Sequence, residues 1–73
     1  MMKLVSNHHI KIVEYVEKTV LEEYYGFIIP AKNDYVYVDK QRYQVYFIEH
    51  HFYSESKTGY NDYINVVVEE VKL

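Results

Sequence analysis

An alternation of apolar and polar side chains over residues 33–53 constrains the fold more than any other feature of this sequence. In DYVYVD (34–39), the two tyrosines fall on one side of an extended chain and the two valines on the other. The following segment, RYQVYFIEHHFY (42–53), continues the period of two. Because this period is typical of β-strands, the pattern predicts a hairpin whose turn begins at Asp39.

A third strand is predicted from YNDYINVVVEEVK (60–72), which follows a polar loop at 54–59. Alternation assigns Ile64, Val66 and Val68 to one face of this strand, and Tyr63, Val67 and Val71 to the other. In the preceding strand it assigns Tyr43, Val45 and Phe47 to one face, and Tyr46, Ile48, His50 and Phe52 to the other. Both faces are apolar, so the sheet must curl into a small barrel or pack against another copy of the chain.

The first third of the chain fits two structures. As a helix, residues 8–25 place their apolar side chains along one stripe, with Gly26 as a C-cap. As a hairpin, IKIVEYV (10–16) pairs with VLEEYYGFII (20–29) across EKT. The chain has one Ala and three Leu, whereas Val, Ile, Tyr, Phe and Thr supply almost half of it, and that composition favours strands.

We therefore expect a mainly β fold, an antiparallel meander of about five strands curled into a small barrel or roll. An α+β fold, with a helix at 8–25 packed on a three-stranded antiparallel sheet, is the alternative. The 73 residues include two Gly, one Pro and no Cys, and they show neither a linker nor a disulfide framework. They predict a single small domain, 1–73. No apolar run is long enough to span a membrane, so a cytoplasmic location is expected.

One segment resembles a known group of proteins. The run FIIPAKNDYVYVDKQRYQVYFIEHHF is similar to a pattern in small uncharacterised β-rich proteins of bacteria and their phages: Pro, then Asp, a strand, a tight turn and Y-x-V. The matching positions are Ile29, Pro30, Asp34, Val36, Val38, Tyr43, Val45, Ile48 and His50. The sequence departs from the pattern at Asn33 and Lys40, where glycine is usual. The resemblance implies a β-rich fold that begins with a hairpin, and a mobile-element origin, but no activity.

Four histidines are the strongest metal ligands in the sequence: His8, His9, His50 and His51. Four imidazoles can bind a tetrahedral zinc ion, and Glu49 and Glu55 could add carboxylate ligands. Adjacent residues of a strand, however, point to opposite faces, so His50 and His51 could share an ion only at a bulge. We expect no metal and no cofactor, and keep a His-based metal-binding protein as an alternative function.

The sequence contains no pattern typical of an active site. There is no cysteine nucleophile, no G-x-S-x-G elbow and no glycine-rich phosphate loop. The net charge of −3 and the scattered basic residues make nucleic acid an unlikely partner. A small barrel that binds single-stranded nucleic acid, stacking bases on Tyr35 and Tyr37 beside Arg42, is nevertheless an alternative.

The interpretation that fits these observations best is a non-enzymatic protein-interaction module that self-associates as a homo-oligomer. Ten tyrosines support it, because tyrosine is enriched in protein interfaces. Strands that are apolar on both faces support it too. The expected interface residues are Tyr46, Ile48, His50, Phe52, Tyr63 and Val67.

Overall fold

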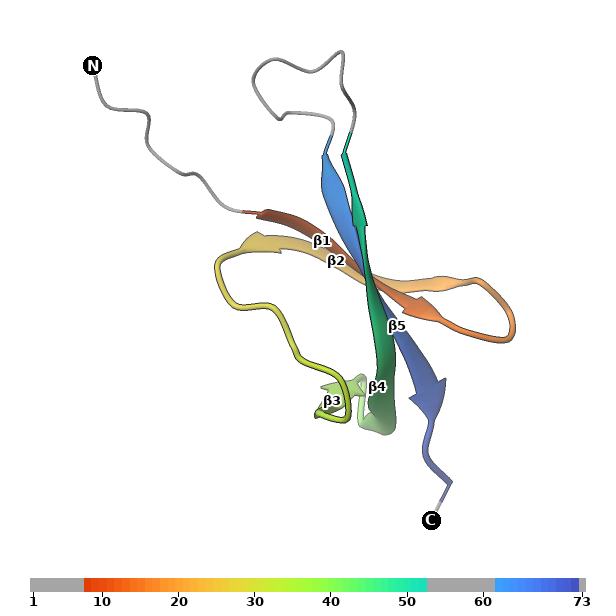
Figure 1. The fold of residues 1–73 in the computed structure, drawn as a ribbon. Coiled ribbons are helices and arrows are strands. Elements are labelled where there is room, and N and C mark those ends of the chain that lie inside the picture. The colour runs from red at the N-terminus through yellow and green to blue at the C-terminus, as the bar shows by residue number, and fades with distance from the viewer. Residues whose placement is uncertain (1–7, 53–61, 73) are drawn as a thin grey trace, which may run out of the picture.

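Five strands form one curled sheet with the shape of a half-barrel (Figure 1). The computed structural model describes residues 8–52 and 62–72. The strands are β1 (His8–Glu14), β2 (Val20–Gly26), β3 (Tyr35–Val38), β4 (Gln41–His51) and β5 (Tyr63–Glu70). The mainly β prediction is confirmed, and residues 8–25 form a hairpin rather than a helix. This described part of the chain has no helix that could cross a membrane.

The sheet has the strand order β2-β1-β5-β4-β3. Three of its pairings are antiparallel, but β1 and β5 run parallel, so the sheet is not the purely antiparallel meander that the sequence predicts. The last strand is therefore the central one, with β1 on one side and β4 on the other. In Figure 1 the β1–β2 hairpin lies at a large angle to β4 and β5, which reflects the strong twist of the sheet. Strands β2 and β3 form the two edges of the sheet within the described part of the chain.

The core lies on one face of the sheet, called the inner face below. Its buried cluster is Ile10, Ile12, Val45, Ile64, Val66 and Val68. The predicted faces of β5 are confirmed, because Ile64, Val66 and Val68 share this face with the core residues of β1. Partly buried apolar side chains surround the cluster: Leu21, Tyr24, Ile29, Val36, Val38, Tyr43 and Ile48. One layer of strands cannot bury them fully.

A bulge in β4 changes which side chains face the core. Val45 pairs with Val68 and Phe47 pairs with Val67, so Tyr46 is the extra residue. The sequence placed Phe47 on the same face as Val45, and this was wrong. Beyond the bulge the alternation is reversed, so that Ile48 joins Val45 on the inner face while Phe47 lies on the opposite, outer face.

The β3–β4 connection is a two-residue turn. Val38 pairs with Gln41, and the two residues between them, Asp39 and Lys40, have φ angles of 51° and 71°. Positive φ at both positions is the geometry of a type I′ turn, in which glycine is favoured. Asn33 also has a positive φ, of 76°. Both sites where the sequence departs from the glycine pattern therefore adopt the conformation for which glycine is suited.

The segment between β2 and β3 is anchored to β4. The backbone N–H of Asn33 donates to the carbonyl of Val45 at 2.9 Å, and the N–H of Val45 donates to the carbonyl of Asp34 at 2.8 Å. The Asp34 carboxylate accepts a hydrogen bond from the Ala31 N–H at 2.8 Å, which closes the local turn. Ile29 packs against the buried cluster, so this segment helps to cover the inner face.

Candidate functional site

The tyrosines divide unequally between the two faces of the sheet. Tyr24 and Tyr43 share the inner face with the core, and burial raises the pKa of both phenols. The carboxylates of Glu70, Glu14 and Asp39 raise the pKa of Tyr43 further. The exposed tyrosines lie on the outer face: Tyr15, Tyr25, Tyr35, Tyr37 and Tyr46. Tyr53 and Tyr60 lie outside the described residues.

Four rings form an aromatic row across the outer face, one from each of β2, β1, β5 and β4. His9 stacks on Tyr25 with ring centroids 4.5 Å apart, and His51 stacks on Tyr63 at the same distance. The two rings in the middle of the row, His9 and Tyr63, have centroids 6.5 Å apart and are tilted relative to each other. Stacking covers one face of the Tyr25 ring, which is nevertheless 65% exposed at the end of the row.

A polar row runs beside the aromatic row on the same four strands, with each member two residues away from the ring on its strand. Its members are Glu23, Lys11, Asn65 and Glu49. Each histidine of the aromatic row contacts one of its carboxylates. His9 Nε2 lies 2.5 Å from Glu23 Oε2, and His51 Nε2 lies 3.3 Å from Glu49 Oε1. The Lys11 ammonium sits over the Tyr63 ring, 4.5 Å from its centroid.

The side-chain amide of Asn65 lies beside the His51–Glu49 pair. Asn65 Nδ2 lies 3.4 Å from Glu49 Oε1 and 3.5 Å from His51 Nε2, so three polar atoms form a nearly equilateral triangle. Asn65 Oδ1 is buried and has no hydrogen-bond partner among the described residues. Sequence analysis considered His51 and Glu49 as metal ligands, but not as a pair with each other, and it missed Asn65. The E-x-H spacing in β4 was an available signal, whereas the Asn65 contact depends on strand register.

An aromatic cluster covers the other end of the outer face. The Tyr15 ring packs edge-on against Tyr46, at 5.0 Å, and against Phe47, at 6.0 Å. Val67, the partner of Phe47 in the sheet, is only 6% exposed beneath them. The chain therefore covers this end of the outer face with its own side chains.

The six predicted interface residues do not form one patch. Tyr46, Tyr63 and Val67 lie on the outer face, and Val67 is buried there. Ile48 and His50 lie on the inner face, where they pair with Val66 and Ile64. His50 is exposed and stacks on Phe52, which is 76% exposed, with centroids 6.1 Å apart.

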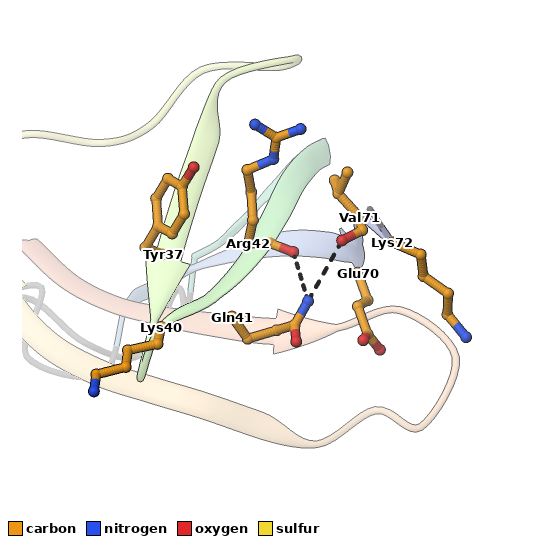
Figure 2. A pocket seen from close by; sticks show the side chains of 7 residues that line it. All are labelled: Tyr37, Lys40, Gln41, Arg42, Glu70, Val71 and Lys72. Atoms are coloured by element: carbon orange, nitrogen blue, oxygen red, sulfur yellow. Dashed lines mark hydrogen bonds between the residues drawn. The ribbon is translucent and has the colours of Figure 1, made fainter.

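The three residues of the predicted nucleic-acid surface do come together. Tyr37 pairs with Arg42, and the Arg42 guanidinium lies over the Tyr35 ring, 4.6 Å from its centroid. Tyr35 and Tyr37 are 54% and 65% exposed. Figure 2 shows the side chains of Tyr37 and Arg42 projecting to the same side of the sheet.

A shallow pocket of about 330 Å³ lies at this end of the sheet (Figure 2). Its lining residues are Tyr37, Lys40, Gln41, Arg42, Glu70, Val71 and Lys72. The Gln41 amide donates to the carbonyls of Arg42 and Val71, at 3.2 and 3.5 Å. In the figure, the Lys40 and Lys72 side chains project away from the Arg42 guanidinium, so the three cations do not converge on one anion site.

The four histidines do not converge on a metal ion. His9 and His51 lie on the outer face, with Tyr63 between them, whereas His50 faces the core side. Among residues 8–52 and 62–72, no group of three or more His, Cys, Asp or Glu side chains could hold a metal. A site that uses only these residue types is therefore not formed in this part of the chain, and Glu55 lies outside it.

Comparison with known proteins assigns no family to the chain. No protein-family model matches it, and no curated protein or solved structure is significantly similar to it. The resemblance to small bacterial and phage proteins therefore stays a prediction, and the function has to be inferred from the geometry described above.

Proposed function

We propose that this domain is a non-enzymatic protein-interaction module that self-associates through the exposed end of its inner face. The observation that carries this proposal is that the inner-face side chains of β4 continue past the buried core to the exposed end of the strand. Val45 is 1% exposed and Ile48 is partly buried, while His50 and Phe52 are exposed. A row of apolar and aromatic side chains that extends from the core into solvent is a surface that a partner can bury.

A second exposed apolar segment follows β2, on the other side of the central strand β5 from β4. Phe27 and Ile28 follow β2 and are 67% and 82% exposed, while the next residue, Ile29, packs against the core. The segment thus extends from the inner face into solvent. Together with the exposed side chains of β4 it supplies exposed aromatic and aliphatic area, the kind that dominates the energetics of interface cores.

The proposed occupant of this surface is a second copy of the chain. A single curled sheet covers only one side of its core, and the seven partly buried apolar residues around that core need a second layer. Two half-barrels that meet by their inner faces would supply that layer to each other. A chain of 73 residues gains more from such sharing than a larger protein, since it buries only about 60% of its unfolded surface alone.

The test is the solution mass of three variants, measured by light scattering coupled to size exclusion. Phe52→Asp is the principal variant because a side chain that is 76% exposed contributes little to folding of the monomer. We expect it to yield a folded monomer. Ile48→Asp should yield a monomer or an unfolded chain. Val16→Asp, which changes a 71% exposed valine in the β1–β2 turn, is the matched control and should leave the oligomer intact.

A second candidate function is the binding of single-stranded nucleic acid on the outer face. It is favoured by the Arg42 guanidinium, which lies over Tyr35 beside the exposed ring of Tyr37. Rings with a free face can stack bases, and a guanidinium can contact the phosphates. This function predicts salt-sensitive binding of a labelled oligonucleotide by fluorescence anisotropy, weakened in Tyr37→Ala and Arg42→Ala. The absence of binding at low salt would exclude it.

A further inference from the structure

The triangle of Glu49, His51 and Asn65 on the outer face cannot be satisfied by hydrogen bonds alone. Its three atoms are pairwise 3.3, 3.4 and 3.5 Å apart. If His51 Nε2 carries a proton, it can donate to Glu49, but it then faces the Asn65 N–H donors. If Nε2 is unprotonated, it accepts from Asn65, but its lone pair then faces the Glu49 carboxylate. One contact of the three is unfavourable in either state.

A half-turn of the Asn65 amide changes this group into a set of three ligands. Oδ1 then occupies the place of Nδ2, and all three atoms at the triangle carry lone pairs. The half-turn gives up the two long Nδ2 contacts, of 3.4 and 3.5 Å. It also exchanges one unpartnered atom for another, because Nδ2 then takes the buried place where Oδ1 has no hydrogen-bond partner among the described residues. The carboxylate and the imidazole are common zinc ligands, and the amide oxygen adds a carbonyl ligand of the kind that harder divalent ions use.

The spacing of the triangle fits a tetrahedral ion. Zinc bonds to nitrogen and oxygen of about 2.0–2.1 Å place tetrahedral ligand atoms about 3.3 Å apart. The three separations in the triangle lie within about 0.2 Å of that value. The Glu49 and His51 side chains are 46% and 35% exposed, so the fourth position is accessible to water.

We propose that Glu49, His51 and Asn65 form a binding site for Zn²⁺ or a similar divalent transition-metal ion. The stack of His51 on Tyr63 holds the imidazole plane in place. The E-x-H spacing keeps both β4 ligands on one face of the strand, and the pairing of Glu49 with Asn65 brings in the third ligand. The site lies on the outer face and does not involve the proposed self-association surface.

The chain contains its own matched control. His9 and Glu23 form the same kind of pair, 2.5 Å apart, on the same face of the sheet. The cross-strand partner of Glu23, however, is Lys11, whereas the partner of Glu49 is Asn65. Lys11 also neighbours Asn65 in β5, so the two pairs differ only in the third ligand. The ammonium group of Lys11 has no lone pair for a metal ion, whereas the Asn65 amide oxygen has. The first pair should therefore not bind zinc.

The test is calorimetric titration of the full-length chain with Zn²⁺, after removal of any affinity tag and treatment with chelator. We expect one ion per chain, and no binding of Mg²⁺, which prefers sites made of oxygen ligands. His51→Ala and Asn65→Ala should each weaken Zn²⁺ binding by at least about tenfold, whereas His9→Ala should leave it unchanged. Asn65→Asp should tighten it, because a carboxylate replaces the amide, and a purely hydrogen-bonding role would not give this result.

Three results would overturn the proposal: no Zn²⁺ binding by the wild-type chain, an equal loss of binding in His9→Ala and His51→Ala, or unchanged binding in Asn65→Ala. Circular dichroism of each variant establishes that the fold is intact. Shifts of the His51 ring protons in NMR spectra on Zn²⁺ addition, with the His9 signals unmoved, would place the ion at the triangle. Shifts at His9 alone would contradict it.

Discussion

Replacement of Lys40 by glycine should stabilise the protein. Lys40 occupies the second central position of the β3–β4 turn with a φ of 71°, a left-handed conformation in which a Cβ atom crowds the backbone. Glycine adopts this conformation without that cost and is preferred at this position of type I′ turns. The Lys40→Gly substitution therefore removes strain from the folded state.

The size of the effect follows from two opposing contributions. Relief of the left-handed conformation is worth about 1–2 kcal/mol. The greater freedom of glycine in the unfolded chain offsets about 0.5–1 kcal/mol of that gain. The net increase in the free energy of unfolding is thus about 0.5–1 kcal/mol. For a domain of this size that corresponds to a rise in Tm of about 2–8 °C.

The assay is thermal unfolding followed by circular dichroism at one fixed protein concentration, since self-association would make Tm concentration-dependent. Lys40→Ala is the matched control: it removes the same charge but keeps a Cβ atom at positive φ, so its Tm should not rise. A Lys40→Gly Tm that is equal to or below that of Lys40→Ala would refute the reasoning.

Two further perturbations test the core and the inner-face tyrosines. Ile10→Ala removes a side chain that is 0% exposed and should lower the free energy of unfolding by about 2–5 kcal/mol, measured by urea unfolding. That is a large fraction of the total of about 4–11 kcal/mol expected for a domain of this length, and a loss below 1 kcal/mol would contradict the described core. The raised pKa values of Tyr24 and Tyr43 mean that the unfolded chain loses these phenolic protons first, so stability should fall as pH rises above about 10. Tyr43→Phe should reduce that fall in a series of Tm measurements against pH, and an unchanged slope would argue against the raised pKa of Tyr43.

The strands themselves could be predicted from the sequence because their side chains alternate. The segment 34–39 contains β3, 42–53 covers most of β4, and the faces of β5 were assigned correctly. In each case burial of one face imposes a period of two that is visible in the sequence. The N-terminal hairpin was predicted less securely, since Ile12, Val13 and Val16 fit a helical stripe as well as a strand.

The relative positions of the strands could not be predicted in the same way. The parallel pairing of β1 with β5 depends on contacts between the two ends of the chain, and no local pattern encodes it. The bulge at Tyr46 has a similar origin, because an extra residue in one strand is defined only by its partner. The bulge shifts the alternation of side chains in β4 by one residue. Ile48 and Tyr63 therefore lie on opposite faces, and the predicted interface residues are separated.

The candidate metal site shows the same limit. Glu49 and His51 have a spacing that sequence analysis can recognise, but Asn65 is brought to them only by the register of β4 against β5. The adjacent pair of His50 and His51 attracted attention in the sequence, yet the strand directs the two rings to opposite faces. The neighbours of His51 across the sheet, rather than along the chain, determine what it can bind.

Self-association through the inner face is the central claim, and the solution mass of the wild-type chain beside Phe52→Asp tests it most directly. Light scattering over a range of protein concentrations, with and without chelator, should give a dimer or a larger assembly for the wild type and a folded monomer for Phe52→Asp. A wild-type monomer throughout, or an unchanged assembly in Phe52→Asp, would contradict the account.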